Sequence, residues 1–324
     1  MNRNQFSSVC AGVAWALMAQ CVLAQSFPSK PVRLINQFAP GSSGDTTLRV
    51  IAPIMNQDLG QPVVIDNRAG GGGVVAAELA MRAAPDGHTI LAATSATQIV
   101  RAFMVRDSTF DALRDFTPIT ALYSAITLMV AHPSVPVSNM GELIDYARRN
   151  PGKLSYGSSG IGTDHHMTGE QIRILTGADI VHVPYKATAQ ALIDVVTGQL
   201  PLTFAITGAA GSFIKSGKIK VLGVVKNQRV ALLPDVASFG ESMPKFVQPP
   251  NWTGIFGPAK LPPAVLARLN ASVVKALQHP DAQARWIANG YEVIGNTPEE
   301  FATQIRQQTA LVAGIVKSAG IKPE

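Results

Sequence analysis

The strongest constraint on the fold is a strand, a turn of small residues and a helix that follow one another between residues 32 and 59. An apolar run up to Phe38 predicts the strand, and apolar side chains at helical spacing predict a helix that begins at Asp45. The turn, 40–44, contains two glycines and two serines. Such a turn offers backbone N–H groups and the positive end of the helix dipole to an anion. A second stretch of this design, 156–166, lies far along the chain, and we expect the two turns to face each other and close on a carboxylate.

Short apolar runs alternate with helical patterns along the rest of the chain. The predicted strands cover residues 62–65, 89–93, 154–156, 180–183, 200–204 and 219–225. This alternation predicts βαβ units and parallel sheets, in which ligands bind outside the carboxyl ends of the strands. The turns after Phe38 and Ala93 should therefore share one edge of a sheet. Pro53 lies inside the first helical pattern, so we expect a kink or an early break there.

Two changes in the pattern indicate where the chain leaves and re-enters its first α/β unit. Apolar residues at 119–123 and 126–130 carry it into a second unit, and the run 252–256, which follows two prolines, returns it. We therefore expect one domain to contain residues 25–123 and 252–324, and the other to contain residues 124–251. A length of 324 residues suits two domains of ordinary size.

The first 24 residues have the pattern of a secretory signal peptide. Arg3 supplies the positive charge, residues 9–23 are mostly apolar, and Ala24 ends a small-residue cleavage site. We expect export to the periplasm, with a membrane anchor as the alternative interpretation. Both cysteines, Cys10 and Cys21, lie in this segment, so the mature chain would contain no disulfide, cysteine nucleophile or thiolate metal site.

Composition argues against several classes of function. Hydrophobic residues make up 47% of the chain and charged residues 15%, which is typical of a globular protein. No apolar run after the first 24 residues reaches the roughly 18 residues needed to span a bilayer. The formal net charge of +6 comes from scattered Lys and Arg residues without interleaved aromatics. We therefore expect no nucleic-acid partner.

Catalytic and cofactor motifs are weak. Ser158 or Ser159 with His166 would make a periplasmic serine hydrolase, but the Gly-x-Ser-x-Gly elbow is missing and residues this close in sequence rarely form a triad. Adjacent His165 and His166 would point about 100° apart on a helix, which disfavours joint binding of a metal. The stretch 71–76 matches a dinucleotide fingerprint only loosely. We expect no enzyme activity, no metal and no cofactor.

The anion-binding interpretation fits the residues better. Ser42, Ser43 and Gly44 in the first turn, and a matching set in the second, supply hydroxyl and backbone donors. The alternative is that both are simply well-formed turns with helix caps. Asp45 occupies the place that an anion would take, so we expect it to cap the helix and order the turn instead of contacting the ligand. Substituting Ser42 by proline should remove a backbone donor and lower the affinity.

Many segments, in order along the chain, resemble the Bug family, the periplasmic solute-binding proteins of tripartite tricarboxylate-type transporters. The resemblance is carried by 27–35 (FPSKPVRLI), 38–41 (FAPG) with Asp45, 59–64 (LGQPVV), 67–68 (NR), 84–87 (APDG), 132–136 (HPSVP), 151–156 (PGKLSY), 182–186 (HVPYK), 233–236 (LPDV), 269–270 (LN) and 297–301 (TPEEF). It covers essentially the whole mature chain. It implies an α/β fold of the type II periplasmic-binding-protein kind, with two α/β domains, joined by two crossovers, and a ligand cleft between them.

The resemblance also implies the ligand, the partners and the binding residues. Family members bind small organic anions, such as amino acids and carboxylates, and hand them to membrane subunits or to sensors. A ligand-sensing adaptor for a membrane receptor is therefore the alternative role, and a monomer is expected. Carried onto this chain, the binding residues are Phe38, Pro40, Gly41, Ser42, Ser43, Gly44 and Asp45, then Ser95 and Thr97, and in the second domain Ser158, Ser159, Gly160, Gly162, Thr163, Tyr185 and Ala205.

Three departures from the family pattern bear on specificity. Residues 41–44 replace the usual Gly-Gly-Gly-Thr, and Asp164 and His165 replace smaller neutral residues. Many relatives carry an aspartate directly after the Phe that corresponds to Phe204, and it could pair with the ammonium group of an amino acid. This chain has Ala205 there. We therefore expect the ligand to be a non-amino organic acid.

Overall fold

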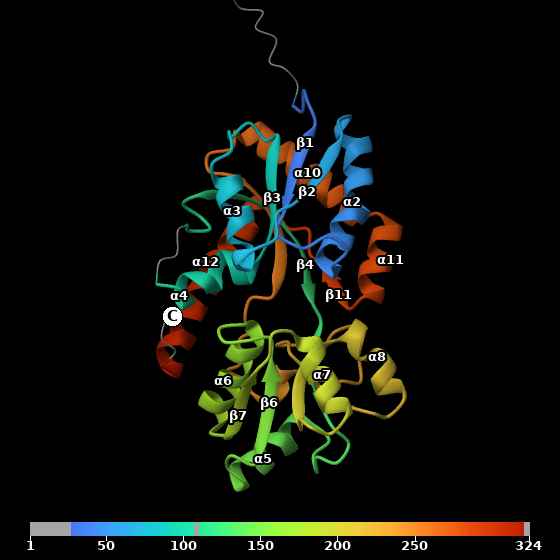
Figure 1. Ribbon diagram of the computed structural model, residues 1–324, viewed down its shortest axis with the longest axis vertical. Helices are drawn as coiled ribbons and strands as arrows, with labels where there is room; N and C mark the ends of the chain where they lie inside the picture. The colour runs from blue at the N-terminus through green and yellow to red at the C-terminus, as the bar shows by residue number, and fades with distance from the viewer. Residues whose placement is uncertain (1–26, 107–109, 321–324) are drawn as a thin grey trace, which may run out of the picture.

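The computed structural model describes residues 27–106 and 110–320, which fold around two separate β-sheets (Figure 1). The signal peptide expected at residues 1–24 lies outside these ranges. The first sheet has six strands in the order β11-β4-β10-β3-β1-β2, and the second has five in the order β7-β6-β8-β5-β9. We call the part of the chain around the six-stranded sheet lobe 1 and the part around the five-stranded sheet lobe 2. Helices pack on both sheets, so the fold is α/β, as the alternation of strands and helices predicted.

The sheet of lobe 1 has a parallel half and an antiparallel half. In the parallel half, β1 (Val32–Asn36) lies between β2 (Val63–Asn67) and β3 (Thr89–Thr94). In the antiparallel half, β10 (Trp252–Pro258) pairs with β3 and with β4 (Phe116–Ala125), and β11 (Tyr291–Val293) pairs with β4. The expected return of the chain to its first sheet at 252–256 is confirmed.

Helices cover both faces of this sheet. One face carries α2 (Ser43–Leu59), α10 (Pro263–Leu277) and α11 (Pro280–Ala288), and the other carries η1 (Gly71–Gly73), α3 (Val74–Met81), the π-helical turn η2 (Ala96–Val100), α4 (Arg101–Met104) and α12 (Pro298–Ala319) (Figure 1). Leu34 is buried in the apolar cluster with α2, and the next residue, Ile35, in the cluster with α3 and α12. Successive side chains of a strand point to opposite faces, so a strand covered on both sides must be apolar throughout.

The early break expected at Pro53 is wrong. The helix α2 continues from Ser43 to Leu59 with Pro53 inside it. Pro53 lies on the exposed side of the helix, where water can bind the carbonyl that proline leaves without an N–H partner. Ile51 and Met55, both almost fully buried, hold the opposite side against the sheet. Packing of the buried face therefore outweighs the lost hydrogen bond.

Lobe 2 has a mixed five-stranded sheet with its own helices. Its strands are β5 (Thr127–Ala131), β6 (Leu154–Ser158), β7 (Ile180–Pro184), β8 (Leu202–Ile206) and β9 (Lys220–Val224). Strand β6 runs parallel to β7 and β8, and β5 runs antiparallel to β8 and β9. Its helices are α5 (Met140–Arg149), α6 (Asp164–Thr176), α7 (Thr188–Val196), α8 (Thr207–Lys215) and α9 (Phe239–Ser242). Phe204 and Ala205 are buried in clusters on opposite faces of this sheet. The strands expected at 154–156, 180–183, 200–204 and 219–225 are thus present, with no boundary shifted by more than two residues.

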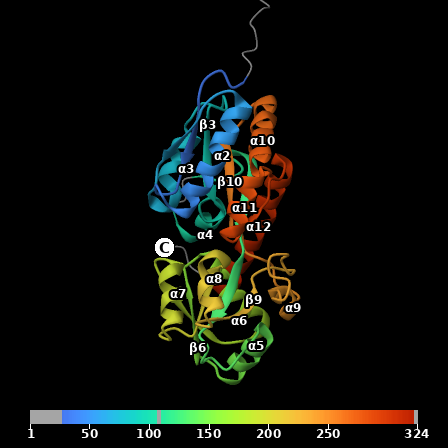
Figure 2. The same cartoon turned by 90° about the vertical axis from the view of Figure 1, so that its right-hand side faces the viewer.

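The chain crosses between the lobes twice. Only Ile126 separates β4 of lobe 1 from β5 of lobe 2, and the return runs from α9 to β10. The side-chain amide of Asn251 donates to the carbonyl of Ala125 at 3.0 Å, so the two crossovers are tied to each other. Both views show the lobes stacked along the long axis of the molecule (Figures 1 and 2). They also touch outside the crossovers, because Met167 of α6 is buried in the same apolar cluster as Ile305 of α12.

Candidate ligand-binding site

A cavity of about 250 Å³ lies between the two lobes. Lobe 1 contributes the first residues of α2, Ser43 and Gly44, together with the last residue of β3 and the two that follow it, 94–96. Lobe 2 contributes the first residues of α6, Asp164 and His165. The turns after Phe38 and after Ala93 therefore line one cavity at one edge of the sheet, as parallel strands require.

The carboxylate of Asp45 orders the first turn. It is 1% exposed and accepts hydrogen bonds from the side chains of Asn36 (3.0 Å), Asn67 (2.8 Å) and Arg49 (2.8 Å) and from the backbone N–H of Gly41 (2.9 Å). Burial by itself would raise the pKa of Asp45, but the hydrogen bonds from Arg49, Asn67 and Gly41 outweigh it and lower that pKa to about 2. The carboxylate is thus ionised and engaged within lobe 1. It orders the turn, as expected, but it does not cap the helix.

The N-cap of α2 is Ser42, and this cap leaves two backbone donors free. The hydroxyl of Ser42 accepts from the N–H of Asp45 at 3.4 Å, while its own N–H donates to the carbonyl of Ala39 at 3.2 Å. The N–H groups of Ser43 and Gly44 have no acceptor within the described part of the chain, and both residues line the cavity. The donor that proline would remove at position 42 is therefore used inside the turn, and the N–H of Ser43 is the better one to test.

Gly44 allows the ring of Phe38 to close over the start of α2. A Cβ atom at position 44 would lie 2.5 Å from the ring of Phe38, far inside contact distance. Phe38 also lines the cavity, so the ring forms part of the wall beside the free N–H groups. A side chain at position 44 would displace this wall.

The stretch after β3 supplies a second wall of the cavity and a hydrogen bond that holds the neighbouring loop. Ser95 is 3% exposed and lines the cavity, and no described group hydrogen-bonds its hydroxyl. Thr97, expected at the ligand, instead donates to the carbonyl of Gly72 at 2.8 Å. It thereby fixes the glycine-rich loop before α3.

Neutral side chains hold the second turn. The hydroxyl of Ser158 lies 2.6 Å from Nε2 of His182, and the N–H of Gly162 donates to Nδ1 of His166 at 3.0 Å. The two imidazole rings stack with centroids 4.1 Å apart. Burial lowers the pKa of both histidines, and the neighbouring His166 helps to bring the pKa of His182 to about 4. Thr163 caps α6, because its hydroxyl accepts from the N–H of His166 at 3.4 Å.

This packing does not assemble the hydrolase site that was the alternative. Ser158 is completely buried, and its partner is His182 instead of His166. Ser159 contacts Nδ1 of His165 at 3.2 Å. A hydroxyl with no exposed surface cannot attack a substrate in the cavity.

The expected binding residues fall into two groups. Those that line the cavity are Phe38, Ser43, Gly44 and Ser95. Those that do not line it are Pro40, which is exposed, and nine residues that make hydrogen bonds in or beside the turns: Gly41, Ser42, Asp45, Thr97, Ser158, Ser159, Gly160, Gly162 and Thr163. Tyr185 donates to Asp194 at 2.8 Å, and Ala205 is packed in an apolar cluster of lobe 2, so neither lines the cavity.

Other lining residues carried no recognisable signal in the sequence. Tyr123, Thr127, Asn251, Thr253 and Tyr291 come from β4, β5, β10, β11 and the second crossover. The hydroxyl of Thr127 is buried and has no hydrogen-bond partner among the described residues. An unpartnered buried hydroxyl in a cavity wall is available to a ligand or to water.

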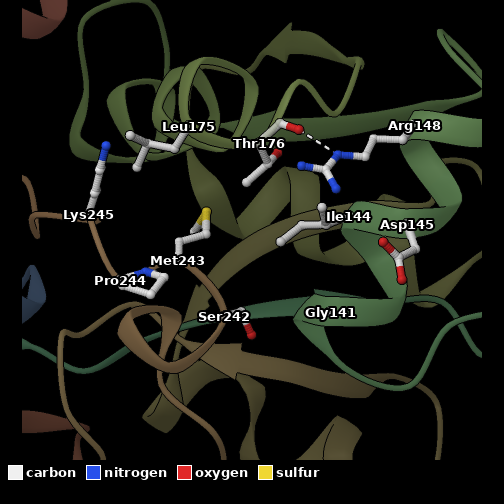
Figure 3. A pocket seen from close by; sticks show the side chains of 10 residues that line it. All are labelled: Gly141, Ile144, Asp145, Arg148, Leu175, Thr176, Ser242, Met243, Pro244 and Lys245. Carbon is white, nitrogen blue, oxygen red and sulfur yellow. Dashed lines mark hydrogen bonds between the residues drawn. The ribbon is translucent and has the colours of Figure 1, made fainter.

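A larger hollow of about 480 Å³ lies elsewhere on lobe 2 (Figure 3). It is formed by α5, the end of α6 and the loop after α9, and its lining includes Arg148, Leu175 and Lys245. Arg148 also donates to the carbonyl of Thr176. None of the expected binding residues lines this hollow, and all of its described lining residues belong to lobe 2. The cavity between the lobes is therefore the better candidate site.

Known proteins resemble the chain over nearly its whole length. The family model described as the tripartite tricarboxylate transporter family receptor matches residues 47–321. A UPF0065 protein of Bordetella pertussis is 33% identical over 314 residues, which cover 97% of each chain. The solved structure of R. palustris Rpa4515 with adipate has a TM-score of 0.77 and 28% identity, and covers 92% of this chain and 100% of that one. The periplasmic binding protein BugD has a TM-score of 0.73 and 30% identity, with the same coverage.

These matches decide the family and the class of protein. The two-lobed α/β architecture is shared with solved periplasmic binding proteins over their full length. Proteins of this family are periplasmic solute-binding receptors and not enzymes. Within residues 27–106 and 110–320, the structure has no helix long and apolar enough to cross a membrane. The chain belongs to the family of tripartite tricarboxylate transporter receptors, which includes the Bug proteins.

Proposed function

We propose that the protein captures a small carboxylate in the cavity between its lobes and delivers it to the membrane subunits of a tripartite tricarboxylate-type transporter. One observation carries the proposal: the N-termini of α2 and α6, from different lobes, end at one cavity. No Lys or Arg is found among the described residues that line it. A carboxylate would therefore be held by the N-terminus of a helix and by hydroxyl groups instead of by a cation.

The carboxylate is assigned to the α2 side. The free N–H groups of Ser43 and Gly44 would donate to it, and Ser43 and Ser95, which carry hydroxyl groups, both line the cavity. Asp45 does not repel it, because its charge is already compensated by Arg49 and by the two asparagines. Support comes from Rpa4515, whose structure contains adipate.

Capture would require the lobes to move relative to each other. We assign the two domains to residues 25–123 plus 252–324 and to residues 124–251. Ser124 and Ala125 still pair within the sheet of lobe 1, so the hinge lies in the crossovers at Ile126 and before β10. Two such segments permit closure around a ligand, because a few hinge residues can absorb the change in backbone dihedral angles. Export through the signal peptide at 1–24 would place the protein in the periplasm. A sensor adaptor would use the same cavity, and no feature of the described residues favours it over transport.

A thermal-shift and calorimetric panel of mono- and dicarboxylates tests the proposal. A ligand that binds only the folded protein raises its melting temperature. Ser43→Pro removes one free N–H, and proline fits the first position of a helix that follows an extended residue such as Ser42. We expect Ser43→Pro to weaken binding about tenfold or more, the size of one charge-assisted hydrogen bond.

Ser43→Ala is the matched control, because it keeps the N–H and removes only the hydroxyl. It should weaken binding less than Ser43→Pro. If no carboxylate stabilises the wild-type protein at millimolar concentration, the proposed function is wrong. If carboxylates bind and Ser43→Pro leaves their affinity unchanged, the α2 N-terminus is not the carboxylate site.

A further inference from the structure

We propose that Asp164 makes the cavity selective for a ligand with a carboxylate at one end and a protonated amine at the other. This inference rests on the proposed function, because it assumes that the carboxylate end sits at α2. It assigns the opposite end to lobe 2. It also replaces the expectation of a non-amino acid, which depended on Ala205, a residue that does not line the cavity.

Asp164 presents a carboxylate that no described group of the protein hydrogen-bonds. It lines the cavity, and its side chain is 26% exposed. Within the described residues its carboxylate accepts no hydrogen bond, and the nearest cationic candidate is Nε2 of His165 at 3.8 Å. That separation is too long for a hydrogen bond, so both carboxylate oxygens remain free to accept one. Asp45, in contrast, has four hydrogen-bond donors around it.

His165 is held firmly beside this carboxylate. Its ring stacks on Phe204 with centroids 5.1 Å apart and an interplanar angle of 5°. Its Nδ1 contacts the hydroxyl of Ser159 at 3.2 Å, and the residue is 8% exposed. Phe204 lies in the core of lobe 2, so the position of His165 is fixed by the fold. The side of α6 that faces the cavity is therefore preorganised before any ligand arrives.

The charges in the cavity wall disfavour a second carboxylate. Asp164 is the acidic residue among the described lining residues, and neither Lys nor Arg accompanies it. A dicarboxylate that reached from α2 to α6 would place its second negative charge near Asp164, and like charges at an interface are strongly unfavourable. An ammonium group at the same place would gain a charge-assisted hydrogen bond.

A second observation is that lobe 2 has an unpartnered hydroxyl group at this cavity. The hydroxyl of Thr127, in β5, is buried, lines the cavity and lacks a hydrogen-bond partner among the described residues. A hydroxyl group can accept from an ammonium group while the carboxylate of Asp164 accepts from it as well. Thr127 and Asp164 would thus bind the amine end, and Ser43 and Gly44 the carboxylate end.

An acidic residue in the first turn of a helix also stabilises that helix, so this simpler role must be separated from ligand selection. Asp281, in the first turn of α11, provides the matched control. It is exposed, lies one position further into its helix than Asp164 does and does not line the cavity. A purely structural role predicts that Asp164→Asn and Asp281→Asn lower the stability of the protein by the same small amount and leave ligand selectivity unchanged. Ligand selection predicts an effect on binding for Asp164→Asn alone.

Calorimetry with pairs of ligands of equal length tests the inference. The pairs are 3-aminopropanoate with succinate, 4-aminobutanoate with glutarate, and 5-aminopentanoate with adipate. For the best-fitting length, we expect the wild-type protein to bind the amino acid at least about tenfold more tightly than the dicarboxylate. Asp164→Asn should abolish most of that preference, and Asp281→Asn should keep it. The melting temperature without ligand shows that both variants fold.

The outcomes separate the two proposals. If neither member of any pair binds, the proposed function itself fails. If dicarboxylates bind the wild-type protein as tightly as the amino acids, or if Asp164→Asn leaves the preference unchanged, the carboxylate capture stands and the role of Asp164 is wrong.

Discussion

The two turns that meet at the cavity have the same kind of helix cap, but a charged side chain supports the first and neutral side chains support the second. In each, a hydroxyl at the N-cap donates to a carbonyl three residues earlier at 2.8 Å and accepts an N–H three residues later at 3.4 Å. Behind the first turn lies an ionised carboxylate, Asp45, surrounded by donors. Behind the second lie the stacked rings of His166 and His182.

This difference decides what each turn leaves for a ligand. The carboxylate of Asp45 is buried and hydrogen-bonded within lobe 1. The polar groups that the first turn presents to the cavity are therefore N–H and hydroxyl donors. The second turn needs no charge for its own structure, so Asp164 at the start of α6 remains free. The same local design thus gives the two lobes opposite electrostatic character at one cavity.

The largest effect that would sharpen this comparison is expected for Asp45→Asn. The change leaves Arg49 without its ion pair and replaces one acceptor oxygen by an NH₂ group that faces other donors. Because the side chain of Arg49 is 52% exposed, the loss comes mainly from buried donors left without an acceptor, which costs about 3 kcal/mol of unfolding free energy. Urea unfolding measures the loss, with Asp164→Asn as the matched control.

Asp164→Asn should cost less than about 1 kcal/mol, because the fold uses that carboxylate only at a helix N-terminus. Similar losses for the two variants would contradict the division between a structural and a free carboxylate.

The second prediction concerns pH. His182 has its pKa lowered from an ordinary value of 6.5 to about 4, so the stability from neutral His182 is complete above pH 6.5 and is lost as the pH falls towards 4. Asp45 has its pKa lowered from 3.8 to about 2, so its contribution is lost only between those values. Lobe 2 should therefore weaken first on acidification, by about 2 kcal/mol once partial exposure of the ring is allowed for.

Urea unfolding of the wild-type protein and of His182→Gln between pH 7 and pH 4 measures this effect. Glutamine can keep a hydrogen bond to Ser158 but does not titrate, so the variant should lose the part of the pH dependence that comes from His182 and keep the part that comes from His166. An unchanged slope in the variant would assign the acid sensitivity to other groups.

The sequence predicted the local elements of this molecule well, and its non-local contacts poorly. The strand, turn and helix around Ser42 and around Thr163 were predictable because each is built from neighbours in the chain. The capping box at Thr297–Glu300 was predictable for the same reason. The early break at Pro53 was wrong because burial of the far side of α2 could not be weighed from its own residues.

The cavity itself depended on contacts between distant segments. Ser158 was expected at the ligand, but it is turned inward by His182, a residue 24 positions later. Thr127 and Asn251 reach the cavity because the two crossovers lie side by side, which no local pattern encodes. Asp164 and His165 were noticeable only as departures from the family pattern. Which residues of a turn face a cavity is thus set by the strand and helix packed behind it.

The smallest expected effect tests whether the caps are truly equivalent. Ser42→Ala and Thr163→Ala each remove one hydroxyl that accepts the N–H of the third helical residue at 3.4 Å and donates to a carbonyl at 2.8 Å. Loss of an N-cap costs about 1 kcal/mol, so the two variants should lower the unfolding free energy by the same amount within a few tenths of a kcal/mol. Urea unfolding at pH 7 measures both. A much larger loss for Thr163→Ala would mean that the hydroxyl of Thr163 also supports the stacked histidine rings through His166. The second turn would then be stabilised mainly by its cap, whereas the first is stabilised mainly by Asp45.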